Sequence, residues 1–81
     1  MKKELLKRIT SNPAILHGAP AIAGHRIAVA TVLDRLSAGE SVKDLLSDYD
    51  GVSVEDILAC IAYGAMLARG SLLDVIAGQS K

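Results

Sequence analysis

The sequence predicts a small, mainly α-helical protein, with a short N-terminal β-element, a three-helix unit of the helix-turn-helix type and a short C-terminal helix. Three observations support this fold class. The chain has only 81 residues, of which 51% are hydrophobic and 2% aromatic, so we expect an aliphatic core of modest size. Glycine and proline recur through the first third of the chain. Apolar residues then follow helical spacing.

The segment from residue 8 to residue 29 is expected to form the β-element. Gly18, Pro20 and Gly24 separate apolar pieces that are too brief for helices. Such pieces favour two or three short strands joined by turns. Residues 23–25 predict a hairpin turn, in which Gly24 adopts a positive φ angle without steric cost.

The trihelical unit is expected over residues 30–69. Its first helix has apolar residues at positions i, i+3, i+4 and i+7, namely Val29, Val32, Leu33 and Leu36. Thr31 is expected to cap this helix, and Gly39 suits the left-handed position that follows its last turn.

The second and third helices each have a serine as the expected N-cap. Ser41 precedes Asp44 by three residues, which is close to a capping box. Ser53 precedes a first turn that holds two carboxylates, where the positive end of the helix dipole favours negative charge.

The C-terminal residues 71–77 are expected to form a short fourth helix or a docking tail, because Gly70 interrupts the third helix near Arg69. Residues 1–81 then make a single domain. The N-terminus does not resemble a signal peptide. The longest apolar run, residues 57–68, is shorter than the roughly 18–20 residues that span a bilayer. The sequence therefore predicts a cytoplasmic protein with no membrane association.

Residues with catalytic or metal-binding potential are few. His17 and His25 lie eight residues apart without a nearby cysteine, which is a poor pattern for a metal site. The single cysteine, Cys60, lies within an apolar helix, where we expect it to be buried and inert. No glycine-rich phosphate-binding motif is present. We therefore predict a non-enzyme that binds no metal ion and no cofactor.

Charge is unevenly distributed although the net charge is zero. Residues 1–35 hold six cations and two carboxylates, whereas residues 36–81 hold three cations and seven carboxylates. This pattern favours one basic and one acidic face, with ordinary solvated surface charge as the simpler alternative. The nucleic-acid-binding candidates are the cations of the basic part: Lys2, Lys3, Lys7, Arg8, Arg26 and Arg35. The partner-binding candidates lie in the acidic part: Asp44, Asp48, Tyr49, Asp50, Glu55 and Asp56.

The third helix stands where a recognition helix would stand but lacks side chains that read bases. It begins with carboxylates and has no cation before Arg69. From Ile57 to Ala68 it is apolar on every face, and a chain of this size has little protein with which to cover such a helix. We therefore expect a homo-oligomer, with a monomeric core helix as the alternative. The interface candidates are Ala59, Ala62, Tyr63 and Met66.

A longer motif runs through the β-element: Asn12-Pro13-x-Ile15-x-x-Gly18-x-Pro20-x-Ile22-x-Gly24-x-Arg26-Ile27. With its continuation through Tyr63, it resembles a widespread family of small bacterial and archaeal proteins over roughly residues 8–66. That family is classed as a domain of unknown function, and parts of it are described as VapB-type antitoxins.

The resemblance implies a homeodomain-like or winged-helix-like trihelical fold behind a β-element. It also implies frequent pairing with a neighbouring PIN-like ribonuclease that acts as a toxin. The chain departs from the family pattern where His25 replaces a threonine and where Asp50 replaces a proline. These changes put the role of the threonine hydroxyl and the rigidity of the turn in doubt. Arg26 is retained, and its role stays open between a phosphate contact and a structural tie.

Three functional hypotheses follow. The first is an antitoxin of a type II toxin–antitoxin pair, which neutralises a PIN-like ribonuclease and is also a candidate repressor of its own operon. The alternatives are a DNA-binding regulator of the helix-turn-helix type without a toxin partner, and a small oligomeric scaffold. The acidic part of the chain favours the first, because the RNA-binding surface of a nuclease is expected to be basic.

Overall fold

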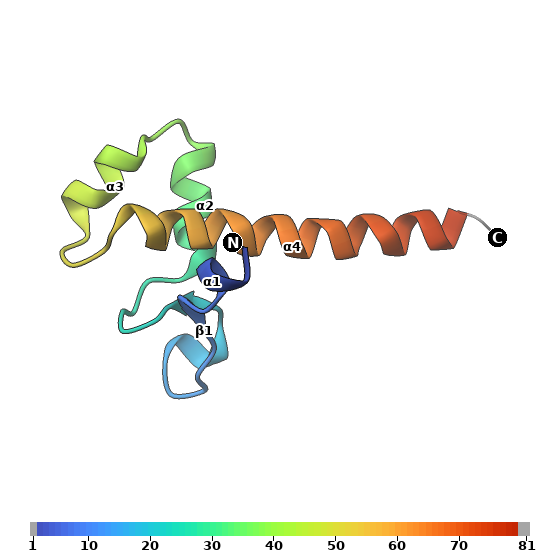
Figure 1. Ribbon diagram of the computed structural model, residues 1–81, viewed down its shortest axis with the longest axis horizontal. Helices are drawn as coiled ribbons and strands as arrows, with labels where there is room; N and C mark the ends of the chain where they lie inside the picture. The colour runs from blue at the N-terminus through green and yellow to red at the C-terminus, as the bar shows by residue number, and fades with distance from the viewer. Residues whose placement is uncertain (1, 80–81) are drawn as a thin grey trace.

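The computed structural model describes the backbone of residues 2–79 and the side chains of residues 3–70. Its longest element is α4 (Val54–Gln79), against which the other α-helices and the first strand pack. In Figure 1, α2 (Val29–Ser37) and α3 (Val42–Asp48) lie above the first half of α4, and α1 (Lys2–Leu6) lies below it. The prediction of a mainly helical protein with a small N-terminal β-element is confirmed.

The β-element is a two-stranded antiparallel sheet. Strand β1 (Ile9–Thr10) pairs with β2 (Ala21–Ile22), with Ile9 opposite Ile22. After β2 the chain turns back at Gly24, which has a φ angle of +81°. The amide of His25 donates to the carbonyl of Ile22 over 3.0 Å and closes this turn. The predicted turn at residues 23–25 is therefore confirmed.

The connection between the strands holds a single turn of 3-10 helix, η1 (Leu16–Gly18). Leu16 and His17 have φ angles of +53° and +56°, and Gly18 follows at +86°. The left-handed region costs a non-glycine residue about 1–2 kcal/mol. Asn12 and Ser11 support this turn, since Asn12 Oδ1 accepts from the amide of Ala14 and the Ser11 hydroxyl donates to the carbonyl of Gly18.

Both predicted serine caps are present. At the start of α3, Ser41 Oγ accepts from the amide of Asp44 while the Asp44 carboxylate accepts from the amide of Ser41. The same reciprocal pair joins Ser53 and Asp56 at the start of α4. The prediction that Thr31 caps the first helix is wrong, because α2 begins two residues earlier, at Val29, and its N-cap has no side-chain hydrogen bond.

The sequence prediction of an interruption at Gly70 is also wrong, since α4 continues to Gln79. Glycine inside a helix costs only about 1 kcal/mol relative to alanine, and no proline follows Gly70 to end the helix. A helix of 26 residues is about 39 Å long, and its second half extends beyond the other elements (Figure 1). The side chains of Leu72, Leu73, Val75 and Ile76, which were expected to dock, lie outside the described residues.

The core is aliphatic, as the composition predicts, and it joins every layer of the fold. Ile22 from β2, Val32 from α2, Leu45 from α3 and Ile57 from α4 are fully buried within one cluster. Ile57 thereby anchors the first turn of α4 to the sheet and to the two preceding helices. Within the described residues, no helix is long and apolar enough to cross a membrane.

Candidate protein-binding surfaces

An ion pair between Arg8 and Asp56 ties the N-terminal segment to α4. Arg8 Nη1 lies 3.1 Å from Asp56 Oδ1, and the other carboxylate oxygen accepts from the amide of Ser53. Burial pushes the pKa of Asp56 upward, but the hydrogen bonds from Ser53 and Arg8 outweigh it and hold this pKa below 3.8. Arg8 was predicted to bind nucleic acid and Asp56 to bind a partner, yet the structure brings them together in one intramolecular contact.

A second network holds Arg35, another nucleic-acid-binding candidate. Its Nε lies 3.0 Å from both carboxylate oxygens of Glu40, and its Nη2 contacts Asp48. The guanidinium also lies 5.2 Å from the centre of the Tyr49 ring. Hydrogen bonds to Glu40, then to Tyr49 and Asp48, raise the pKa of Arg35 above its ordinary value. This network joins the end of α2 to the end of α3.

The remaining cations predicted to bind nucleic acid lie on separate elements. Lys3 and Lys7 are exposed at α1, and Lys7 makes one long contact with Glu4 (3.5 Å). Arg26 is exposed next to the turn that follows β2, and within the described residues it has no hydrogen-bond or ion-pair partner. The side chain of Lys2 lies outside the described residues. The proposed structural tie through Arg26 is therefore absent from the described contacts.

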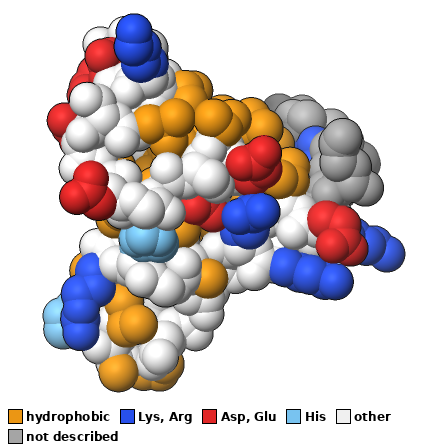
Figure 2. All heavy atoms as spheres, turned by 60° about the vertical axis from the view of Figure 1, so that its left-hand side comes forward, with side chains coloured by type: hydrophobic (Ala, Val, Ile, Leu, Met, Phe, Trp, Pro, Cys, Tyr) orange, Lys and Arg blue, Asp and Glu red, His pale blue; other side chains and the backbone are white. Residues whose placement is uncertain are grey.

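Carboxylates gather at the end of the molecule formed by α3 and the turn into α4, which we call the acidic end. Figure 2 shows red side chains over this part of the surface. Its members are the exposed or half-buried carboxylates Glu40, Asp44, Asp48, Asp50 and Glu55. Hydrogen bonds from the backbone and hydroxyl of Ser41 lower the pKa of Asp44. Asp50 and Glu55 have no ion-pair partner among the described residues.

The exposed face of α4 is apolar where a recognition helix would read bases. Val54, Leu58 and Ile61 are each between 42% and 44% exposed. They lie at positions i, i+4 and i+7 and therefore share one face of the helix. Such a face offers no hydrogen-bonding groups to base edges but suits contact with another protein.

The four oligomer-interface candidates divide between this exposed side and the interior. Ala59 is fully buried within the chain, so its prediction as an interface residue is wrong. Ala59 lies on the side of α4 that packs against the rest of the fold. Because the helix is apolar on every face, the sequence could not show which side is buried. Ala62 is half-buried and Met66 is 40% exposed. Tyr63 is half-buried and lines a groove within the chain.

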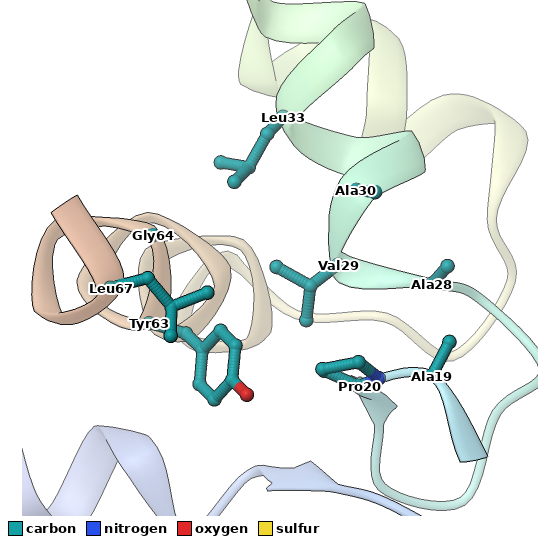
Figure 3. A pocket seen from close by; sticks show the side chains of 9 residues that line it. All are labelled: Ala19, Pro20, Ala28, Val29, Ala30, Leu33, Tyr63, Gly64 and Leu67. Atoms are coloured by element: carbon teal, nitrogen blue, oxygen red, sulfur yellow. The ribbon is translucent and has the colours of Figure 1, made fainter. Parts of the chain in front are cut away.

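That groove has a volume of about 200 Å³ and lies between α4, the start of α2 and the segment before β2. In Figure 3, the side chains of Leu33, Val29 and Leu67 point into it, and the ring of Tyr63 stands beside Pro20. Gly64 allows the close approach of the two helices, because a Cβ atom there would lie 2.9 Å from Leu33 Cδ1. The lining is apolar, so the groove suits an apolar side chain and no acid–base chemistry.

Cys60, a residue of α4, is fully buried in the core. Burial, and then the charge of Asp56, raise the pKa of its thiol to about 11. Since the thiolate is the reactive form, Cys60 is expected to resist iodoacetamide at about pH 8 in the native protein and to react fully in concentrated urea. Mass spectrometry measures the rate of labelling. Equal rates in the native protein and in urea would contradict the buried position of Cys60.

Within residues 3–70, no group of three histidine, cysteine or carboxylate side chains is arranged to hold a metal ion. His17 is exposed on η1, while His25 is half-buried with its Cε1 beside Gly51. The two histidines are thus placed on separate turns. The described surface offers regions for binding rather than a cluster of reactive groups.

Two features of these surfaces were not anticipated. Glu40 completes the Arg35 network. The two residues are five positions apart across a glycine turn, so they do not have the spacing of three or four residues that predicts an ion pair on a helix. The exposed stripe of α4 did have a signal, since Val54, Leu58 and Ile61 follow alternating intervals of four and three residues. The apolar composition of the whole helix concealed it.

The fold and these surfaces define a small, mainly helical protein with a two-stranded N-terminal sheet, an acidic end and an exposed apolar helix face. The chain belongs to the DUF433 family, a protein family of unknown function, whose model matches residues 9–64. This confirms the resemblance to a family of unknown function, and the description as VapB-type antitoxins stays a prediction. The chain is similar to a DUF433 member protein from Anabaena variabilis ATCC 29413, known from a crystal structure at 2.00 Å resolution. The TM-score is 0.73 with 26% identity, and the match covers 91% of this chain and 73% of the other. A comparison with curated proteins gives no match.

Proposed function

We propose that this chain is the antitoxin of a type II toxin–antitoxin pair and neutralises a PIN-like ribonuclease by covering its RNA-binding surface. The observation that carries this proposal is the acidic end. Five carboxylates surround α3 and the turn into α4, and Lys43 is the one exposed cation among the described residues of that region. A nuclease guides the anionic RNA backbone with basic side chains, and a carboxylate-rich surface is complementary to them.

The distribution of the cations supports the same proposal. Arg8 and Arg35 are committed to ion pairs within the chain, so a phosphate contact would require breaking them. The start of α4, where a helix-turn-helix protein contacts bases, carries Glu55 and apolar side chains. Binding to a basic protein surface therefore agrees better with these contacts than sequence-specific binding to DNA. Repression of the operon stays a prediction, for which Lys3, Lys7 and Arg26 are the exposed candidate cations outside the contacts of Arg8 and Arg35.

The first test is genetic and biochemical. A reading frame for a PIN-like ribonuclease is expected beside the gene, and its product is expected to co-purify with this chain and to lose RNA cleavage in the complex. If no such frame is present, or if the purified ribonuclease cleaves RNA equally fast with excess chain, the proposal is wrong.

A pair of charge variants tests the acidic end itself. Asp48→Asn with Asp50→Asn removes two negative charges, while Arg35 keeps its contacts with Glu40. Because exposed charges act mainly on the encounter rate, association with the ribonuclease is expected to slow by about three- to tenfold and to depend less on salt. Stopped-flow fluorescence at two salt concentrations measures both effects.

The matched control is Glu4→Gln with Asp34→Asn, which removes the same charge from exposed positions on α1 and α2. This variant is expected to associate at close to the unmodified rate. If the two double variants slow association equally, net charge rather than the acidic end directs binding, and the proposed surface is wrong.

A further inference from the structure

The exposed face of α4 carries a regular apolar seam formed by Val54, Leu58, Ile61, Ala65 and Ala68. The intervals between these residues alternate between four and three, which is the a/d heptad spacing of a coiled coil. The first three are 44%, 44% and 42% exposed, and Ala68 is also exposed. Exposed aliphatic side chains in a single row are costly in water and mark a contact surface.

We propose that this seam pairs in antiparallel orientation with the same seam of a second copy of the chain. The two-fold axis passes at the level of Ala62 and Tyr63. An isologous interface requires a surface that is complementary to itself, and the seam meets this requirement. In this register Ile61 packs against the partner's Ala65, and Leu58 packs against the partner's Ala68.

The order of large and small residues selects the antiparallel arrangement. Every such layer joins one large side chain to one alanine, so the helices keep an even separation of about 8 Å. A parallel, in-register pair would instead join large residues near Val54 and small residues near Ala68. The helices would then be held apart at one end and unsupported at the other.

Charge complementarity points to the same register. Glu55 and Arg69 flank the seam on one side, fourteen residues apart, and both are exposed. Neither has an ion-pair partner among the described residues. In the antiparallel register each Glu55 lies opposite the partner's Arg69, so the pair forms twice about the axis. A second copy is therefore the occupant that satisfies both the apolar seam and its flanking charges.

The seam from Val54 to Ala68 is about 21 Å long, which is shorter than most stable coiled coils. We expect a dimer with a dissociation constant on the order of micromolar. Glu55 belongs both to this surface and to the acidic end, whereas Asp48 and Asp50 lie outside the seam. The test of the dimer uses this protein alone, without the ribonuclease.

Sedimentation velocity over a concentration series, on the order of 1–200 µM, tests the pairing. Ile61→Glu places a charge in the central layer and is expected to raise the dissociation constant at least tenfold. Met66→Glu is the control, because Met66 is similarly exposed on α4 but lies off the seam. Circular dichroism confirms that each variant is folded. A wild-type protein that stays monomeric throughout, or equal effects of the two variants, overturns the proposal.

A charge exchange tests the register. Glu55→Arg and Arg69→Glu, each alone, place like charges opposite one another and are expected to weaken the dimer by about three- to tenfold. The double variant restores opposite charges across the axis and is expected to return the dissociation constant to within about twofold of wild type. Additive weakening in the double variant overturns the antiparallel register.

Discussion

Replacing Asp56 by alanine is expected to lower the free energy of unfolding by about 2–3 kcal/mol. The carboxylate accepts from the amide of Ser53 and from Arg8, and its side chain is only 11% exposed. Alanine removes the reciprocal cap of α4 and leaves Arg8 without its partner. For a small domain this loss is a large fraction of the total stability. Urea denaturation at low protein concentration, on the order of 1 µM, measures the change without a contribution from dimerisation.

Two further variants separate the contributions of Asp56. Asp56→Asn keeps an oxygen that accepts from Ser53 but removes the charge that faces Arg8, so a smaller loss of about 1 kcal/mol is expected. Asp34→Ala serves as the control, because Asp34 is exposed on α2, and its effect is expected to stay within about 0.5 kcal/mol. A loss in Asp56→Ala no larger than in the control would show that the contact adds nothing to stability.

The pH dependence of stability follows from the same carboxylate. Its pKa in the folded protein lies below the ordinary value of 3.8. The contribution is therefore complete above the unfolded pKa and declines as the pH falls below about 4, through the folded value. Urea midpoints of wild type are expected to fall over this range more steeply than those of Asp56→Asn.

Local features of the fold could be predicted from the sequence, because their causes lie within a few residues. Ser41 and Ser53 both form the expected N-caps. The reciprocal bond predicted for Ser41 and Asp44 is present, and Ser53 and Asp56 form the same bond, which was not predicted. Gly24 turns the chain where a positive φ angle was expected. The apolar spacing near Val32 located α2 within one turn, although its cap was misassigned.

Contacts between distant residues could not be predicted in this way. Arg8 and Asp56 are 48 residues apart in sequence, and nothing local distinguishes a cation that pairs internally from one that binds phosphate. Likewise, a helix that is apolar on every face does not indicate which residues are covered, so Ala59 could not be distinguished from Ala62. Packing of α1, α2 and the sheet makes that distinction.

The structure thus divides the charged residues into two groups with different roles. Arg8 and Arg35 join elements of the fold, whereas the acidic end retains carboxylates such as Asp50 that have no internal partner among the described residues. This division explains how a chain with zero net charge presents an acidic surface. The basic excess in the first 35 residues is partly neutralised inside the molecule. The unpaired carboxylates around α3 and the turn into α4 stay exposed to water, where a basic partner can bind them.

Two isoleucines one turn apart on α4 are expected to respond oppositely to the same truncation. Ile57 is fully buried among the core residues, whereas Ile61 is 42% exposed on the seam. Ile57→Ala leaves a cavity and is expected to cost about 3 kcal/mol of the free energy of unfolding. Ile61→Ala is expected to cost less than about 1 kcal/mol in the monomer, because much of its side chain already contacts water. In the dimer, however, it removes the large side chain from both central layers, in which Ile61 of each copy faces the partner's Ala65.

Paired measurements on the two variants therefore distinguish folding from assembly. Urea denaturation on the order of 1 µM is expected to separate Ile57→Ala from wild type and to leave Ile61→Ala close to it. Sedimentation velocity on the order of 100 µM, under conditions where both are folded, is expected to show the dimer weakened by Ile61→Ala and retained by Ile57→Ala. If Ile61→Ala instead destabilised the monomer as much as Ile57→Ala, this face of α4 would belong to the core of a single chain. The apolar seam would then be a property of the fold and not a surface for a second copy.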